Sequence, residues 1–277
     1  MDLAEPGHAA LERITMKILE CKSKKWISLL LLFSAASSAQ FPRFKALAFF
    51  SRTAEPAHVD FARDAIRYFE GLTWGDAFVF DTTSAWSDLN AEKLKGYSVI
   101  LMLNETPRSA EQRRAFEQYM KGGGGWFGFH AAGYNDAATG WPWFLEFLGG
   151  GVFWRNSWPL LPARLAVEDP RIPATRNLPP DFMSPENEWY QWKPSPRANP
   201  DVRVLVSLSP DNYPLGLKDT IPDGDLPVVW TNTKYRMIYM NMGHGNRIFS
   251  DPTQNALIIA GLRWVVGSDA GGSPFER

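Results

Sequence analysis

Cysteine is almost absent from this sequence of 277 residues, which contains one, Cys21. It lies in an N-terminal segment that we expect to be removed, so the remaining chain has no thiol for catalysis or for a disulfide. An excess of charge is also missing, because 29 Lys and Arg residues face 30 Asp and Glu residues, for a net charge of −1. Without a basic surface, we expect no nucleic-acid partner.

Long hydrophobic runs are missing too. The apolar stretch at 26–33 is too short to span a bilayer, so we expect no stable membrane insertion. It follows a lysine-rich segment, 22–25, and precedes small residues, which is the layout of a secretory signal peptide cleaved near Ala39. We therefore expect a signal peptide with an upstream extension over 1–39, a single domain over 40–277, and a periplasmic or secreted location. The alternative for the segment is an N-terminal amphipathic helix of the fold.

The chain after the signal peptide begins with alternating short apolar runs and amphipathic segments. This pattern predicts strands over 44–51, 78–81, 98–104 and 125–130, and helices over 58–71, 88–97 and 109–123. Ser109 and Gln112 are spaced for a capping box on the third helix, which Gly122 would end. The alternation predicts an α/β fold with a flavodoxin-like, doubly wound and mostly parallel sheet that has helices on both faces.

The second half has a different pattern. From 141 to 200 the sequence is rich in aromatic residues and proline and shows few clean periods. Further strands are predicted over 163–168, 202–208, 226–232 and 236–242, and a final helix over 253–267. Because several of these strands read as hairpins, we expect antiparallel additions to the sheet in the C-terminal half.

Polar residues follow the predicted strands at one edge of the sheet. Open parallel sheets bind ligands beyond the carboxyl ends of their strands. The residues at these positions are Ser51, Asn104, Glu105, His130 and His244, and His58 begins the first helix. All three histidines that follow the signal peptide therefore fall on one predicted edge, as in a functional cleft. The alternative for each histidine is a structural role.

The stretch GGGGWFGFHAAG, 122–133, has features of two known motifs. Its glycines precede a strand, and no Lys-Ser or Lys-Thr pair follows them, so it is not a phosphate-binding P-loop. We expect them to end a helix and turn tightly into the strand. The turn after the strand has the position of a nucleophile elbow but carries His130 where a Ser or Cys would stand. This excludes covalent acyl chemistry there and leaves His130 as a general base, a hydrogen-bond donor or a metal ligand.

Several motifs in this order, followed by a helix that ends in RWVVG, resemble the ThuA-like (trehalose-utilisation) family: GGGGWFGFHAAG, FLGGGVF, NEWYQW, PVVWTN and MGHG. The resemblance covers residues 44–267. It implies a class I glutamine amidotransferase-like fold without the amidotransferase cysteine, so we expect no glutamine amidotransferase activity. It also implies a role in carbohydrate metabolism, on a disaccharide, a glycoside or a keto-sugar.

The family's motif positions fall, residue by residue, on His58, His130, Glu188 and His244. The chain departs from the family pattern at two places. The aspartate that usually precedes the glutamate is Asn187 here, and a common His-Pro pair is replaced by Asn-Ser-Trp-Pro at 156–159. If that missing histidine were a ligand or an acid in the family, this chain would lack it.

Tryptophan is abundant between 126 and 192, and its ring suits the C–H faces of sugars. We expect most of these rings to fill the core. The rings in polar, loop-like sequence are the predicted sugar contacts: Trp158, Trp189 and Tyr190. The predicted substrate-binding set also includes His58, Ser51, Asn104 and Glu105.

Two functions of different class are consistent with these residues. In the first, the chain is an enzyme in which His130 and His244 act as an acid–base pair and Glu188 assists. In the second, it is a non-catalytic carbohydrate-binding protein on a relic of the amidotransferase fold. A further alternative beside these two is a structural relic of the same fold that binds protein partners. The sequence leaves a divalent metal open as a cofactor, with His58, His130, His244 and Glu188 as its ligands. It also leaves open whether the chain forms a homo-oligomer.

Overall fold

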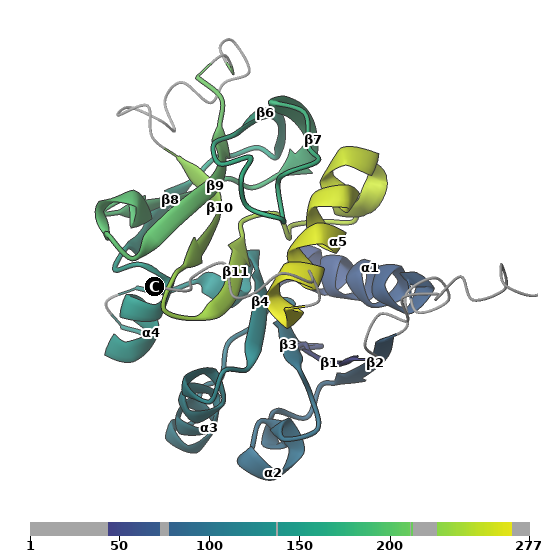
Figure 1. Cartoon of the computed structure of the whole chain (residues 1–277), viewed down its shortest axis with the longest axis vertical. Coiled ribbons are helices and arrows are strands. Elements are labelled where there is room, and N and C mark those ends of the chain that lie inside the picture. The colour runs from purple at the N-terminus through teal and green to yellow at the C-terminus, as the bar shows by residue number, and fades with distance from the viewer. Residues whose placement is uncertain (1–43, 73–77, 137, 211, 213–225, 268–277) are drawn as a thin grey trace, which may run out of the picture. The chain divides into compact units, whose positions relative to one another are not determined.

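The computed structural model describes residues 44–267 except 73–77, 137, 211 and 213–225 (Figure 1). The predicted signal peptide, 1–39, lies outside these residues. Among the described residues, no helix is both long and apolar enough to cross a membrane.

Five parallel strands form one part of a nine-stranded sheet. In order across the sheet they are β2 (Phe78–Thr83), β1 (Phe44–Phe49), β3 (Val99–Met102), β4 (Gly125–Phe129) and β11 (Arg236–Met240). This is the strand order of flavodoxin-like folds, with the fifth strand supplied by the end of the chain. Every residue of β3 and β4 is buried, as expected for central parallel strands covered on both faces. The predicted flavodoxin-like, mostly parallel sheet is confirmed.

Helices cover both faces of this sheet (Figure 1). One face carries α1 (Pro56–Leu72) and α5 (Pro252–Val266), and the other carries α2 (Ala91–Leu94), α3 (Ala110–Lys121) and α4 (Pro142–Leu148). Successive side chains of β1 point to opposite faces. Ala46 and Ala48 join the core under α1 and α5, while Leu47 and Phe49 join the core under α3 and α4.

The glycine run after α3 has the role that the sequence predicts. The helix begins with a complete capping box between Ser109 and Gln112. After its end, Gly123 has a φ of +86°, which favours glycine. A Cβ on Gly124 would lie 2.3 Å from the ring of Tyr119. The glycines therefore end α3 and turn the chain back into β4.

Four antiparallel strands extend the sheet beyond β11, in the order β10 (Pro227–Asn232), β9 (Val202–Leu208), β6 (Leu161–Val167) and β7 (Asp181–Asn187). A separate two-stranded sheet pairs β5 (Val152–Asn156) with β8 (Tyr190–Lys193). The predicted antiparallel additions are confirmed, and β9 has the predicted bounds.

The sequence pattern missed α4, β5, β7 and β8, all between 141 and 200. The two strands of the small sheet have only five and four residues, too few to show a period. β7 alternates between buried and exposed positions but contains Pro185, which lowers its strand propensity. These strands form because a partner strand is available, rather than through their own apolar pattern.

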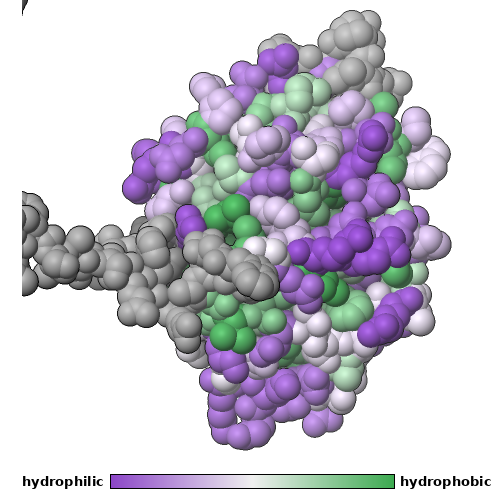
Figure 2. Space-filling model, turned by 90° about the vertical axis from the view of Figure 1, so that its right-hand side faces the viewer, coloured by the Kyte–Doolittle hydropathy of each residue, from purple (hydrophilic) through white to green (hydrophobic). Residues whose placement is uncertain are grey.

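The surface mixes polar and apolar side chains. On the face that Figure 2 shows, hydrophilic residues are spread among hydrophobic ones. The exposed large hydrophobic side chains of the described residues come from different elements: Val79, Tyr134, Trp154, Trp158 and Met183. Two of them, Trp154 and Trp158, lie in or next to β5.

Candidate functional site

His130 directly follows β4 and begins a single 3₁₀ turn, His130–Gly133. Its φ is +43°, and no other non-glycine residue of the described chain has a positive φ. The left-handed conformation costs about 1–2 kcal/mol for an L-residue, so the surrounding structure must hold it in place. The turn therefore has the sharp backbone of a nucleophile elbow, with an imidazole where a hydroxyl or thiol would stand.

Glycines allow the chain to crowd around this elbow. A Cβ on Gly243 would lie 2.5 Å from the Cβ of His130, and a Cβ on Gly133 would lie 2.1 Å from the ring of Tyr239. The Tyr239 hydroxyl donates a hydrogen bond to the His130 carbonyl oxygen at 3.0 Å. These contacts fix the backbone of the elbow against β11 and the loop that follows it.

Replacing Gly243 with alanine is expected to lower the free energy of unfolding by about 1–3 kcal/mol, because the added methyl group would overlap the His130 side chain. Urea unfolding followed by circular dichroism measures this change. Gly71→Ala is the matched control. Gly71 lies in α1 with no atom within 4 Å of the missing Cβ, so alanine should raise stability by about 0.4–1 kcal/mol. Equal effects of the two variants would contradict the crowding at Gly243.

The His130 imidazole is fully buried and has a partner at each nitrogen. Nδ1 lies 2.7 Å from the carbonyl oxygen of Asn241. Because a carbonyl oxygen only accepts, Nδ1 carries a proton. Nε2 lies 3.1 Å from Oε2 of Glu188, and a hydrogen bond there requires one further proton, on the nitrogen or on the oxygen. His130 and Glu188 together therefore hold one transferable proton.

The surroundings of this pair set its properties. Burial lowers the pKa of His130, and the hydrogen bond and charge of Glu188 oppose that shift. The Tyr190 ring stacks on the imidazole with 4.0 Å between ring centroids. The amide of Asn156 donates to the other carboxylate oxygen of Glu188. Because the Glu188 side chain is 13% exposed and the His130 side chain is not exposed at all, the pair meets solvent through the carboxylate.

The structure brings together all three histidines of the described residues. The ring centroid of His58 lies 5.1 Å from that of His130 and 4.9 Å from that of His244, and the remaining pair is 5.5 Å apart. Burial, together with the charges of His130 and His244, lowers the pKa of His58 to about 3. His58 is therefore neutral at physiological pH and offers a free nitrogen lone pair.

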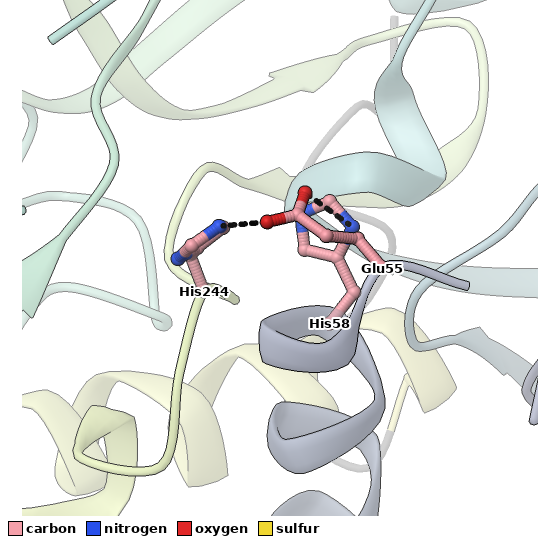
Figure 3. A group of neighbouring side chains, drawn as sticks. All are labelled: Glu55, His58 and His244. Carbon is pink, nitrogen blue, oxygen red and sulfur yellow. Dashed lines mark ion pairs between the residues drawn. The ribbon is translucent and has the colours of Figure 1, made fainter. Parts of the chain in front are cut away.

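Glu55 joins this cluster, although the sequence analysis did not single it out. Figure 3 shows its carboxylate between the rings of His58 and His244. Oε1 lies 3.4 Å from Nε2 of His244, and Oε2 lies 3.8 Å from Nδ1 of His58. The sequence feature that could have identified Glu55 is its spacing from His58, Glu-x-x-His, which places both side chains on the same side at the start of α1. Two carboxylate–histidine groups could hold a metal ion: Glu55, His58 and His244, or His58, His130 and Glu188.

Asn187, which stands where the family motif has an aspartate, is fully buried. Its side-chain oxygen accepts hydrogen bonds from the backbone of Gly243 at 3.2 Å and of His244 at 3.1 Å. Its side-chain nitrogen donates to the Glu188 carbonyl oxygen at 2.8 Å, which an ionised aspartate could not do. The asparagine therefore ties the loop of Glu188 to the loop of His244. The second departure from the family pattern, Asn156, contacts Glu188 directly.

Asn104 supports the backbone in this structure. Its side-chain oxygen accepts from Ser51 N at 2.7 Å, and its nitrogen donates to the carbonyl oxygens of Ser51 at 3.0 Å and His58 at 3.2 Å. Glu105 pairs with Arg108 at 2.6 Å. Ser51 and Glu105 line a pocket of about 310 Å³ whose walls include none of the three histidines. These three polar residues thus lie at the predicted edge but do not join the imidazole cluster.

The three aromatic side chains of the predicted sugar contacts lie in different environments. Trp189 is fully buried, and its indole N–H donates to the Leu161 carbonyl oxygen at 2.9 Å. It therefore belongs to the core and offers no surface to a ligand. Tyr190 is 5% exposed and covers His130. Trp158 is 72% exposed and is free to contact a ligand.

The fold and the site define the class: an α/β protein with a flavodoxin-like sheet, extended by antiparallel strands, and a histidine–carboxylate cluster at its carboxyl edge. Residues 46–265 match the sequence model of the ThuA family, described as trehalose utilisation, and the chain belongs to this family. The expected resemblance is confirmed. The family description places its members in carbohydrate metabolism.

Solved structures agree with this assignment. A ThuA-like protein from Bacteroides uniformis is 55% identical, with a TM-score of 0.80, over 88% of this chain and 99% of its own. A ThuA-like protein from Parabacteroides merdae is 18% identical, with a TM-score of 0.59, over 84% of this chain and 94% of its own. A β-galactosidase from Bacillus circulans shares the fold over 83% of this chain but only 32% of its own, at 11% identity and a TM-score of 0.50. No curated protein matches the chain.

Proposed function

We propose that this chain is an exported enzyme that acts on a disaccharide, a glycoside or a keto-sugar by proton transfer at the histidine cluster, without a covalent intermediate. The observation that carries this proposal is the His130–Glu188 pair. Nδ1 holds one of the pair's two protons and donates it to the Asn241 carbonyl oxygen. The other proton lies between Nε2 and the carboxylate, where it is free to move to or from a substrate.

The position of the pair supports catalysis. The elbow lies at the carboxyl edge of the parallel strands, where open sheets of this kind bind their ligands. His244 lies 3.9 Å from Oε2 of Glu188, so a second imidazole is within reach of the same substrate. In this arrangement His130 and Glu188 form the acid–base unit, and His244 is a further imidazole beside it.

A carbohydrate substrate is supported by the family description and by the aromatic surface near the site. The exposed ring of Trp158 lies two residues beyond Asn156, whose amide contacts Glu188. Aromatic faces bind the C–H surfaces of sugar rings, while polar groups at the site bind the hydroxyls. Trp158 is therefore the sugar contact that we assign to the rim of the site.

The test is an assay of the purified protein with trehalose, other disaccharides and their keto derivatives. Each sugar is followed by chromatography for turnover and by thermal shift for binding. The proposed function requires turnover of at least one sugar. A sugar-dependent thermal shift without turnover would instead establish the non-catalytic carbohydrate-binding protein, and the absence of both effects would contradict a carbohydrate function.

Export rests on the arrangement of lysines, apolar residues and small residues before Ala39. We expect the protein produced in a bacterial host to accumulate outside the cytoplasm with Gln40 at its N-terminus. Cell fractionation followed by N-terminal sequencing measures both properties. A cytoplasmic chain that retains residues 1–39 would overturn this part of the proposal.

A further inference from the structure

The Glu55 carboxylate lies between two imidazoles that come from opposite ends of the described chain (Figure 3). His58 belongs to the first turn of α1, Glu55 directly precedes that helix, and His244 belongs to the loop after β11. The His244 side chain is 4% exposed and that of His58 is 12% exposed, whereas the Glu55 side chain is 56% exposed. The group thus offers the nitrogens of two largely buried imidazoles and the oxygens of one carboxylate that faces solvent.

The backbone that carries these donors is fixed by hydrogen bonds. Gly245 N donates to the Ala57 carbonyl oxygen at 3.1 Å, which joins the His244 loop to the first turn of α1. The Asn187 side chain holds the backbone N–H of His244, and the Asn104 side chain holds the carbonyl of His58. Hydrogen bonds within the chain therefore hold the segments that carry Glu55, His58 and His244 next to one another.

The imidazoles of this group form no hydrogen bond with another side chain or with the backbone of the described residues. Nε2 of His58 and Nδ1 of His244 are buried without a partner, and the other nitrogen of each ring faces the Glu55 carboxylate. Buried polar atoms are almost always hydrogen-bonded in native proteins or bound to a water or an ion. The nitrogens that face Glu55 also lack a hydrogen bond of normal length with it, and two imidazole nitrogens beside one carboxylate are ligand types that a divalent metal ion takes.

The distances fit a metal ion better than a hydrogen bond. The two nitrogen–oxygen separations, 3.4 and 3.8 Å, exceed the usual 2.7–3.2 Å of an N–H···O bond. Bonds of about 2.0–2.2 Å from a tetrahedral Zn²⁺ ion to nitrogen and oxygen place two of its ligands about 3.3–3.6 Å apart. The 3.4 Å separation lies in this range, and the 3.8 Å separation lies slightly beyond it. The ligand atoms of Glu55, His58 and His244 all lie within 4.8 Å of one another.

We propose that Glu55, His58 and His244 bind one divalent transition-metal ion, of which Zn²⁺ is the best match. Two histidines and one glutamate are the protein ligands of one class of catalytic zinc sites, which leave a fourth position open. That position would face solvent beside the exposed Glu55 and bind a hydroxyl or carbonyl oxygen of the sugar. The use of the ion in the reaction rests on the function proposed above, whereas the binding of the ion does not.

The test measures metal binding directly and needs no substrate. The purified full-length protein is stripped with a chelator and dialysed against Zn²⁺ or Co²⁺, and the bound metal is counted by elemental analysis. We expect about one ion per chain and the visible absorption of tetrahedral Co²⁺. Removal of an outer-shell partner weakens metal binding by 10–100-fold, so loss of a ligand in Glu55→Gln should weaken it by at least about 100-fold.

Two matched carboxylate-to-amide variants give the controls. Glu105→Gln changes a carboxylate that pairs with Arg108 and should leave metal affinity unchanged. Glu188→Gln should also retain the ion, because Glu188 belongs to the other possible group. The proposal is overturned if the wild-type chain binds neither metal, if Glu55→Gln binds it normally, or if Glu188→Gln loses it instead. Metal binding without sugar turnover would support the metal site while contradicting the proposed function.

Discussion

The His130→Asn variant is expected to lose turnover of its substrate by about 10²–10⁴-fold, the usual contribution of a general acid or base. The imidazole shares the second proton of the His130–Glu188 pair with the carboxylate, and an amide at this position cannot take up or release a proton near neutral pH. Asparagine is chosen because it tolerates a positive φ, and the native φ is +43°. Steady-state kinetics on the sugar identified in the assay measure the change.

Stability and binding separate this chemical effect from a structural one. The variant should keep its circular dichroism spectrum and its sugar-dependent thermal shift, because the amide of asparagine occupies less volume than the imidazole and needs no backbone change. A large fall in kcat with an unchanged KM would assign His130 to the transition state. Full turnover by this variant would remove His130 from the catalytic group and with it the proposed mechanism.

Replacing Trp189 with alanine is expected to lower the free energy of unfolding by about 3–5 kcal/mol, because it removes a fully buried indole from the core. The change also leaves the Leu161 carbonyl oxygen without the indole N–H donor at 2.9 Å. Urea unfolding of the two proteins measures the difference. Where the alanine variant does not fold, Trp189→Phe keeps most of the volume and removes the hydrogen bond with a smaller loss of packing.

Trp158→Ala is the matched control for Trp189. Its side chain is 72% exposed, so its removal should change stability by less than about 0.5 kcal/mol. It should instead weaken the sugar-dependent thermal shift, since Trp158 is the assigned contact at the rim. A stable Trp189→Ala protein with lost sugar binding would contradict the core position of Trp189 and restore it as a ligand contact.

The parallel half of the fold was predictable because its strands are continuous apolar runs between amphipathic helices. The capping box of α3 and the glycine turn into β4 depend on local signals and are confirmed. The segment with α4, β5, β7 and β8 was not predictable in this way. Its strands are short, and each is stabilised by pairing with a partner that the local sequence does not specify.

The candidate site likewise has features that the sequence predicts and features that depend on tertiary packing. His58, His130 and His244 were expected at one edge because that edge collects the carboxyl ends of parallel strands. Their contacts, including the Asn241 carbonyl oxygen on Nδ1 of His130 and the Asn156 amide on Glu188, depend on tertiary packing. Sequence context alone also could not tell that Trp189 is buried and Trp158 is exposed. Both lie in polar sequence, and only the pairing of β5 with β8 and of β6 with β7 places one in the core.

The segment that holds β5, β7 and β8 has a consequence for how the candidate site is assembled. His58, His130 and His244 lie in α1 and in the segments that follow β4 and β11, but Glu188 and its Asn156 partner come from the segment around β5, β7 and β8. The proton-sharing pair therefore forms only where this segment packs against the end of β4. A chain in which the segment has not docked would lack the pair that the proposed function requires.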